Sequence, residues 1–311
     1  MSLAIVFPGQ GSQSVGMLSA FADLPEVRQT FEEAAEALGF DLWRMVNEGP
    51  EAELNQTVNT QPAVLAAGMA LWRAWQARGG AQPVVAAGHS LGELLALTAS
   101  GAIDFAAALP LVRTRASLMQ EAVAGQATAM MAVLGLDDAA VVAACAAAAQ
   151  GEVCEAVNFN GPGQVVIAGH AAAVSRAGDI AKQQGAKRAL PLAVSVPSHC
   201  SLLRGAGAAF GQHLQGVSMA APRFPVVQNA DRQAHSDTAA IKDALARQLY
   251  SPVPWTATVA DMAVQGVTRI VECGPGKVLT GLNKRIAGEI ECLALSERAT
   301  FDQLLGGQGH V

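Results

Sequence analysis

The sequence predicts an α/β fold built on a parallel sheet, with a second, smaller unit inserted into the chain. Over residues 1–125, and again after residue 198, short apolar segments alternate with helical ones, as expected when helices cover both faces of a parallel sheet. Residues 126–197 instead show the order βαββαβ of a ferredoxin-like unit. We therefore expect a large domain of residues 1–125 and 198–311 and a small domain of residues 126–197.

The elements of the large domain follow from apolar runs and from helical periodicity. Strands are expected at residues 3–7, 83–87, 224–230 and 269–274. Helices are expected at residues 21–38, 59–79, 105–123, 237–250 and 275–286, and Pro110 either starts or kinks the third of these.

The small domain is predicted in the same way. Its strands are expected at residues 128–136, 153–160, 164–170 and 186–194, and its helices at residues 137–149 and 171–185. Asp137 or Asp138 is a suitable N-cap for the first helix. The middle two strands are joined through Gly161-Pro162-Gly163, which are residue types that favour a turn.

Composition excludes several classes of protein. Apolar residues make up 51% of the 311 residues and charged residues 15%, which is typical of a folded globular chain. The net charge of −6 argues against nucleic acid as a partner. The longest uncharged apolar run, residues 139–149, is too short to span a membrane. No basic region precedes the first strand, so no signal peptide is expected.

Cysteine spacing and glycine spacing exclude metals and nucleotide cofactors. The five cysteines are scattered and match no metal-ligand pattern, so reduced thiols in the cytoplasm and no metal are expected. Gly9-Gln10-Gly11 lacks the third glycine of a dinucleotide fingerprint, because Ser14 stands there. Gly276-Lys277 lacks the upstream glycine and the following Ser or Thr of a P-loop.

One short motif suggests catalysis. Gly88-His89-Ser90-Leu91-Gly92 follows a predicted strand and precedes a helical pattern. The two glycines let the chain turn sharply, which exposes the serine at the apex. This is the spacing and the context of a nucleophile elbow, so Ser90 is the candidate nucleophile. Five-residue matches also occur by chance, and an ordinary strand-to-helix turn is the alternative.

A serine hydroxyl needs a neighbouring base to act as a nucleophile. His199 is the candidate, because it lies in a loop where the chain returns from the small domain to the large one. A structural histidine is the alternative. His89 lies beside Ser90, but adjacent side chains at a turn apex diverge, so we expect His89 to pack or to cap. His213, His235 and His310 are expected at the solvated surface.

No acidic residue between Ser90 and His199 has an obvious setting for orienting the histidine. Most of these acids fall at caps, on helix surfaces or in the inserted unit. The full set is Glu93, Asp104, Glu121, Asp137, Asp138, Glu152, Glu155 and Asp179. Another group, such as a backbone carbonyl, is therefore expected to orient the imidazole, which points away from an ordinary esterase.

Arg115 interrupts an apolar helical face within residues 105–123. A buried guanidinium needs an anionic partner. That partner is either a protein carboxylate in a buried salt bridge or the carboxylate of a substrate, held by two parallel hydrogen bonds.

The segment Phe7–Gln13, FPGQGSQ, follows the first strand. Its backbone N–H groups could form one half of an oxyanion hole, with the N–H of Leu91 as the other half. A simple strand-terminal turn is the alternative.

These residues belong to a wider set of motifs through which the chain resembles, nearly end to end, the malonyl-CoA:acyl-carrier-protein transacylases of fatty-acid synthesis. The main departure is Leu94, where many members carry an aromatic residue. The motifs are Phe7-Pro8-Gly9-Gln10-Gly11-Ser12-Gln13, Asn59-Thr60-Gln61-Pro62, Gly88-His89-Ser90-Leu91-Gly92-Glu93, Arg115 with Met119-Gln120, Asn158-Phe159-Asn160 before Pro162-Gly163-Gln164, Val196-Pro197-Ser198-His199-Cys200, Gln248 before Tyr250-Ser251-Pro252-Val253, and Gly274-Pro275-Gly276.

The resemblance implies a hydrolase-like large domain with a ferredoxin-like insertion. It also implies that Ser90 is acylated and that His199 is the general base. The remaining roles that it implies are His199 oriented by the main-chain carbonyl of Gln248, an oxyanion hole of the Gln10 and Leu91 N–H groups, a malonyl carboxylate bound by Arg115, and a cleft lined by Gln61, Met119 and Asn160.

The expected activity is ping-pong transfer of a malonyl group from malonyl-CoA to the phosphopantetheine thiol of an acidic acyl carrier protein, by a monomer. The CoA thioester is a substrate, so no cofactor is expected. The alternatives are a serine thioesterase or esterase, a catalytically silent carrier-binding subunit and the transacylase component of a malonate decarboxylase. The basic residues that could dock the carrier are Lys182, Lys187, Arg188, Lys277, Lys284 and Arg285.

Overall fold

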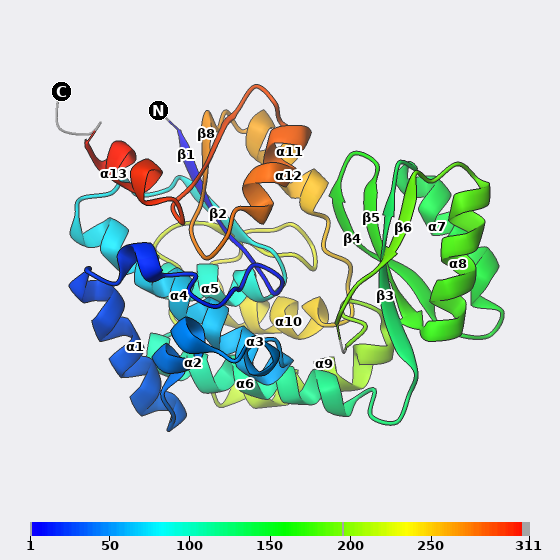
Figure 1. The fold of residues 1–311 in the computed structure, drawn as a ribbon, viewed down its shortest axis with the longest axis horizontal. Coiled ribbons are helices and arrows are strands. Elements are labelled where there is room, and N and C mark those ends of the chain that lie inside the picture. Colours follow the sequence, from blue (N-terminus) through cyan, green and yellow to red (C-terminus); the bar gives the residue numbers. More distant parts are fainter. Residues whose placement is uncertain (1, 195, 307–311) are drawn as a thin grey trace.

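Two sheets carry the fold of the computed structural model, which describes residues 2–194 and 196–306 (Figure 1). The larger sheet is parallel and has the strand order β7-β2-β1-β8-β9. Its strands are β1 (Leu3–Phe7), β2 (Val85–Gly88), β7 (Val226–Val227), β8 (Arg269–Glu272) and β9 (Glu291–Ala294). The predicted α/β class is confirmed.

Helices cover both faces of the parallel sheet, because side chains alternate along each strand. In β1, Ile5 and Phe7 face one apolar cluster, while Ala4 and Val6 face another. The second cluster is covered by α11 (Trp255–Val264) and α12 (Val278–Ile286). The first is covered by α1 (Pro25–Leu38), α2 (Leu42–Glu48), α4 (Thr57–Ala77), α5 (Leu91–Ala99), α6 (Phe105–Glu121), α9 (Arg204–Gln215), α10 (Thr238–Gln248) and α13 (Arg298–Gly306).

The smaller sheet is antiparallel and has the order β4-β5-β3-β6, which is the ferredoxin-like arrangement. Asp137 caps the first helix of this unit, its side chain accepting a hydrogen bond from the Ala140 N–H. The elements are β3 (Thr128–Leu134), α7 (Asp138–Ala149), β4 (Cys154–Gly161), β5 (Gln164–His170), α8 (Ala171–Gln183) and β6 (Arg188–Pro191).

The two faces of the smaller sheet have different neighbours. Val133, Val165 and Ile167 pack against α7 and α8. On the opposite face, Met130 and Val166 belong to a cluster that includes Cys200, which lies after the chain has left the unit. This face is therefore turned toward the rest of the molecule, as Figure 1 also shows.

Backbone hydrogen bonds attach the smaller sheet to the larger unit. The Phe159 N–H donates to the Val253 carbonyl (3.0 Å), and the Val253 N–H donates to the Val157 carbonyl (2.8 Å). The segment that leads into α11 thus pairs alongside the edge strand β4. This pairing fixes the position of the small sheet relative to the larger unit. The domain boundaries at 125/126 and 197/198 stay a prediction.

Some elements differ from the prediction. Helix α1 starts at Pro25 because Ser19–Phe21 form a separate 3-10 turn. The strand expected at 224–230 is reduced to Val226–Val227, since the chain then turns back and the Gln228 N–H donates to the Gln233 carbonyl. Pro110 lies inside α6, which begins at the N-cap Asp104.

Several short elements are not predicted from the sequence. These are α2, α3 (Glu51–Leu54), α11, β9 and α13. Within the described residues, the helices include none with both the length and the apolar character needed to cross a membrane.

Candidate active site

Ser90 occupies a strained turn between β2 and α5, with a φ of 55°. The glycines on either side allow the backbones to approach closely. A Cβ added at Gly88 would lie 1.8 Å from the Gly92 carbonyl carbon, and one at Gly92 would lie 2.1 Å from the Phe7 oxygen. Asn229 stabilises the turn, because its Oδ1 accepts a hydrogen bond from the Ser90 N–H (2.9 Å).

The hydroxyl of Ser90 lies 2.7 Å from Nε2 of His199. The other ring nitrogen of His199, Nδ1, donates to the main-chain carbonyl of Gln248 at 2.8 Å. Because a carbonyl can only accept, this bond places the proton on Nδ1 and leaves Nε2 free to accept from Ser90. The predicted serine and histidine are therefore together, and a carbonyl rather than a carboxylate orients the ring.

The end of helix α10 supplies this carbonyl. Carbonyls in the last turn of a helix have no partner within the helix, and they carry the negative end of its dipole. Gln248 is the last residue of α10, and the carbonyl of the next residue, Leu249, accepts from the His199 N–H at 3.0 Å. The helix end thus fixes both the backbone and the ring of His199, and its carbonyl takes the place that a carboxylate would have in a serine-histidine-acid triad.

His199 is held in its neutral form. Burial, together with the nearby charge of Arg115, lowers the pKa of its imidazole from 6.5 to about 3. A neutral imidazole can accept the proton of Ser90 over the whole neutral range of pH.

Arg115 is 1% exposed and reaches the same hydroxyl. Its Nη2 donates to Oγ of Ser90 (3.2 Å) and to Oε1 of Gln248 (2.9 Å), and its Nη1 donates to Oε1 of Gln61 (3.0 Å). Burial lowers the pKa of the guanidinium to about 10, so it stays charged at neutral pH. Within the described residues it forms no ion pair, and its partners are neutral. The alternative of a buried salt bridge is therefore not found.

One cavity of about 210 Å³ collects the predicted residues. All of them line it except Gln248, which acts from behind His199 and Arg115. Polar groups form one wall of the cavity. Apolar side chains from the small sheet, the segment after it and α12 form an apolar wall of the cavity: Met130, Val166, Leu192, Val194, Val196, Val278, Leu279 and Leu282.

The two N–H groups predicted to form an oxyanion hole meet at this cavity. Leu91 is the first residue of α5, and Gln10 lies in the loop after β1. The loops are adjacent, since a Cβ at Gly9 would lie 3.8 Å from the Leu91 nitrogen. In the part of the chain that the structure describes, neither N–H donates to a protein acceptor. A helix N-terminus also favours negative charge.

The remaining predicted residues lie around this centre. His89 lies 2.8 Å from Asn160 Oδ1 through its Nε2, and its ring packs 5.6 Å from that of Trp255, so it packs as expected. Gln61 Nε2 donates to the Met119 sulfur at 3.9 Å. Of the other histidines, His310 lies outside the described residues.

The sequence analysis misses two residues of the site, Asn229 and Glu93. Asn229 falls inside the strand predicted at residues 224–230, whereas β7 ends at Val227 and Asn229 lies in the loop that follows it. Its Nδ2 also donates to the Gly88 carbonyl at 2.8 Å. Glu93 was grouped with the acids that have no obvious role in orienting His199. It is fully buried, and its Oε2 accepts a hydrogen bond from Gln248 Nε2 at 2.8 Å.

A hydroxyl on an elbow, a neutral base and two N–H donors are the parts that acyl transfer through a serine requires. The comparison with known families agrees with this arrangement. The chain belongs to the acyl transferase domain family, whose model matches residues 4–288.

Relatives with this fold carry a more specific name. The chain is 54% identical over 303 residues to the malonyl CoA-acyl carrier protein transacylase of Salmonella typhimurium, covering 97% of this chain and 98% of that protein. It is 55% identical over 295 residues to the protein of that name in Escherichia coli strain K12, covering 94% and 96%.

Solved structures of such enzymes also match over nearly their full length. An acyl carrier protein S-malonyltransferase from Vibrio cholerae matches with a TM-score of 0.95 and 55% identity, covering 98% of this chain and 100% of that one. A malonyl-transacylase in complex with its type II PKS acyl-carrier protein matches with a TM-score of 0.97 and 52% identity, covering 99% and 100%.

Proposed function

We propose that this chain transfers the malonyl group from malonyl-CoA to the phosphopantetheine thiol of an acyl carrier protein and so supplies malonyl units for fatty-acid synthesis. The observation that carries this proposal is Arg115. Its buried guanidinium has no protein counter-ion among the described residues and lies within hydrogen-bond distance of Ser90. A cation in that place selects an acyl group that ends in a carboxylate.

In the first half of the reaction, His199 Nε2 takes the proton of Ser90 as Oγ attacks the thioester carbonyl of malonyl-CoA. The negative charge that develops on the carbonyl oxygen is held by the N–H groups of Gln10 and Leu91. Such a donor typically contributes about 3–4 kcal/mol in the transition state. The carbon–sulfur bond then breaks, and the CoA sulfur takes the proton from His199 to leave as a thiol.

The second half reverses these steps with a different thiol. The phosphopantetheine thiol gives its proton to His199 and attacks the malonyl ester on Ser90. The tetrahedral intermediate collapses, a new thioester forms on the carrier, and Ser90 recovers the proton. One thioester is thus converted into another, and the reaction needs no reactant beyond malonyl-CoA and the carrier thiol.

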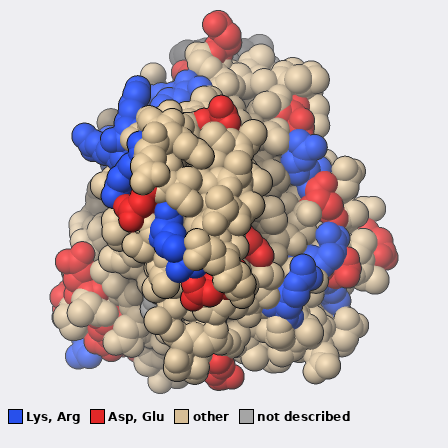
Figure 2. Space-filling model, turned by 90° about the vertical axis from the view of Figure 1, so that its right-hand side faces the viewer, with Lys and Arg blue, Asp and Glu red and all other residues tan. Residues whose placement is uncertain are grey.

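Exposed basic residues near the cavity are candidates for docking an acidic carrier. Figure 2 looks at the side of the molecule that carries the small sheet and shows Lys and Arg side chains gathered at its upper left. Of the six candidates, Lys182 and Lys277 are paired with acids among the described residues. Lys284 and Arg285 lie two and three residues beyond the cavity-lining Leu282 and are exposed.

The proposed location is the cytoplasm. The support is that Cys145, Cys154, Cys200, Cys273 and Cys292 are all free thiols. Disulfides are rare in reducing compartments, so five buried free thiols fit such a location.

Intact mass spectrometry after brief exposure to malonyl-CoA tests the activity. We expect a malonyl adduct that peptide mapping places on Ser90, and no adduct on the Ser90→Ala variant. Addition of a phosphopantetheinylated carrier protein should then remove the adduct and produce malonyl-carrier. Release of free malonate in place of malonyl-carrier would indicate a thioesterase, and absence of any adduct would overturn the proposal.

A further inference from the structure

Glu93 lies three residues after Ser90, in the first turn of α5, and is fully buried. A single oxygen of its carboxyl group carries its hydrogen bonds. Oε2 accepts from the side-chain amide of Gln248 (2.8 Å) and from the N–H of Asn229 (2.8 Å). The other oxygen, Oε1, has no partner among the described residues.

Both partners of Glu93 are in direct contact with the catalytic groups. Asn229 accepts the Ser90 N–H. Gln248 makes three such contacts: its Nε2 also donates to the Ser90 carbonyl at 3.0 Å, its Oε1 accepts from Arg115, and its main-chain carbonyl accepts from His199. One residue therefore contacts the serine, the arginine and the histidine, and its side-chain orientation depends on Glu93.

Glu93 also fixes which way the Gln248 amide points. An amide has a donor end and an acceptor end. Because a carboxyl oxygen without a proton only accepts, Glu93 requires the Nε2 end, and this leaves the Oε1 end for Arg115. If the amide were reversed, its NH₂ group would face the guanidinium and both donors would be unsatisfied.

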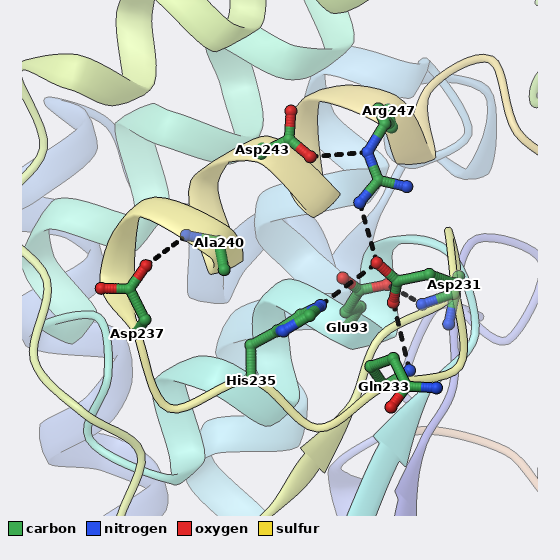
Figure 3. Close-up of polar contacts among 9 residues, drawn as sticks. Glu93, Asp231, Gln233, His235, Asp237, Ala240, Asp243 and Arg247 are labelled. Carbon is green, nitrogen blue, oxygen red and sulfur yellow. Dashed lines mark hydrogen bonds and ion pairs between the residues drawn. The ribbon is translucent and has the colours of Figure 1, made fainter.

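The side-chain amide of Gln248 lies between the carboxyl group of Glu93 and the guanidinium of Arg115. A direct ion pair would occupy the donors that a substrate carboxylate needs. Burial raises the pKa of Glu93 to about 7, while the Gln248 bond, the Asn229 bond and the charge of Arg115 oppose that rise. Asp231 is the other charged group that acts on it. Figure 3 shows Asp231 beside Glu93, bonded to Arg247 and His235.

We propose that Glu93 is a positioning residue of the transfer reaction, acting through Gln248 to hold Arg115 and His199 in register with Ser90. This inference rests on the proposed malonyl transfer. It adds a residue that touches neither the substrate nor the reacting atoms, and it predicts that malonyl selectivity depends on a side chain outside the cavity lining.

Two variants separate the hydrogen bonds of Glu93 from its bulk. Glu93→Gln can keep an oxygen at the Oε2 position and place its NH₂ where Oε1 lacks a partner. Glu93→Leu keeps a similar volume but leaves Gln248 Nε2 and the Asn229 N–H without an acceptor. Rates of acyl-enzyme formation are measured with malonyl-CoA and with acetyl-CoA at about pH 6, where much of Glu93 is protonated and Gln is a close mimic.

Glu272 provides the matched control. It is likewise fully buried, its pKa is likewise raised to about 7 by burial, and it accepts from the N–H groups of Leu279 and Thr280. Among the described residues it makes no hydrogen bond to Ser90, His199 or Arg115. Glu272→Leu therefore removes a buried carboxylate of the same kind without reaching Gln248.

We expect Glu93→Gln to acylate with malonyl-CoA at a rate within about threefold of wild type. Glu93→Leu should lose roughly tenfold to a hundredfold, as when reacting groups are misplaced, and its malonyl-to-acetyl ratio should fall. Glu272→Leu should leave that ratio unchanged. If Glu93→Leu does not fold, as judged by circular dichroism, then Glu93→Ala replaces it and is expected to lower the rate and the ratio in the same way.

The inference is overturned if the folded Leu or Ala variant keeps the wild-type ratio, or if Glu93→Gln is as defective as Glu93→Leu. Failure of the proposed function has a different signature, because the wild-type protein itself would then form no malonyl adduct. The two failures are thus distinguished by the wild-type measurement.

Discussion

At the scale of single residues, the properties of the site follow from two buried groups, the charged Arg115 and the neutral His199. Among the described residues Arg115 forms no ion pair, so its charge is available to a ligand, and it contacts neutral amide oxygens and the Ser90 hydroxyl. The cation also favours negative charge on the Ser90 oxygen. Burial keeps His199 neutral and the charge of Arg115 acts in the same direction, so Arg115 bears both on the acyl group that binds and on the low pKa of the base.

The substitution Arg115→Ala should lower the preference for malonyl-CoA over acetyl-CoA more than it lowers the rate of acylation by acetyl-CoA. We expect the malonyl-to-acetyl ratio of acylation rates to fall about 30- to 1000-fold, which corresponds to the loss of about 2–4 kcal/mol from a charged pair of hydrogen bonds. Parallel measurements with malonyl-CoA and acetyl-CoA give the ratio directly. An unchanged ratio would show that the carboxylate is recognised elsewhere.

The pH dependence of acylation should reveal the low pKa of His199. A base is active while it is unprotonated, so a pKa of about 3 predicts no loss of acetyl loading as the pH falls from 8 through the ordinary histidine value of 6.5. In Arg115→Ala the pKa should rise, because one cause of its depression is removed, and the acid limb should move to higher pH. Acetyl-CoA is the suitable substrate, since it has no carboxylate to titrate. A wild-type limb near 6.5 would contradict this prediction.

At the scale of elements, two helix ends define the catalytic centre. The N-terminus of α5 presents the Leu91 N–H to the cavity, and the C-terminus of α10 presents the Gln248 carbonyl to His199. Helix dipoles favour negative charge at the first end and positive charge at the second. These are the places where an oxyanion and a protonated imidazole are expected during transfer.

The close approach of β1, β2 and α5 makes the elbow glycines irreplaceable. In Gly92→Ala the new Cβ would lie 2.1 Å from a backbone oxygen, so the strand and the helix must separate. We expect a loss of about 3 kcal/mol or more in the free energy of unfolding and little acylation of Ser90. Chemical denaturation and the mass-spectrometric assay measure the two effects.

Gly281→Ala is the control for this substitution. Gly281 lies inside α12 and nothing is within 4 Å of the position that its Cβ would take. Alanine there should stabilise the protein by about 0.5–1 kcal/mol, because glycine is a poor helix former. Equal effects of the two substitutions would mean that packing at the elbow is not tight.

At the scale of the whole molecule, the cavity exists because two units meet. The parallel sheet supplies the reactive groups, while the open face of the small sheet and α12 supply an apolar wall. Neither unit alone encloses the site. Lys284 and Arg285 are exposed on α12, the helix that also contributes Leu279 and Leu282 to this wall, which suits an acidic carrier that delivers a thiol on a long arm.

Charge reversal at Lys284 tests this arrangement. Lys284→Glu should raise the KM for the carrier protein about 3- to 10-fold at low salt, because rim charges steer encounter. Transfer from the preloaded enzyme to free pantetheine, which is uncharged, should not change. Arg28→Glu, the same charge change on the distant helix α1, is the control (Figure 1). Equal losses with both acceptors would contradict a docking role.

Much of the site could be predicted because its signals are local. The elbow spacing places Ser90, and the loop between the two units places His199. Asn229 and Glu93 were missed because their roles depend on distant partners, such as the bonds from Asn229 to Gly88 and from Glu93 to Gln248. Short elements such as β9 were missed because four residues show no clear periodicity.

The sequence by itself determined the α/β class, the inserted βαββαβ unit and the elbow that carries the candidate nucleophile Ser90, because these depend on local turns and on periodicities within single elements. Only the tertiary structure decided that Arg115 has no protein counter-ion within the described residues and that a helix end replaces the acid. It also decided that Glu93 lies outside the cavity lining and accepts a hydrogen bond from Gln248. The physical reason is that burial and pairing of charge depend on residues from separate segments, whose distances no local pattern records.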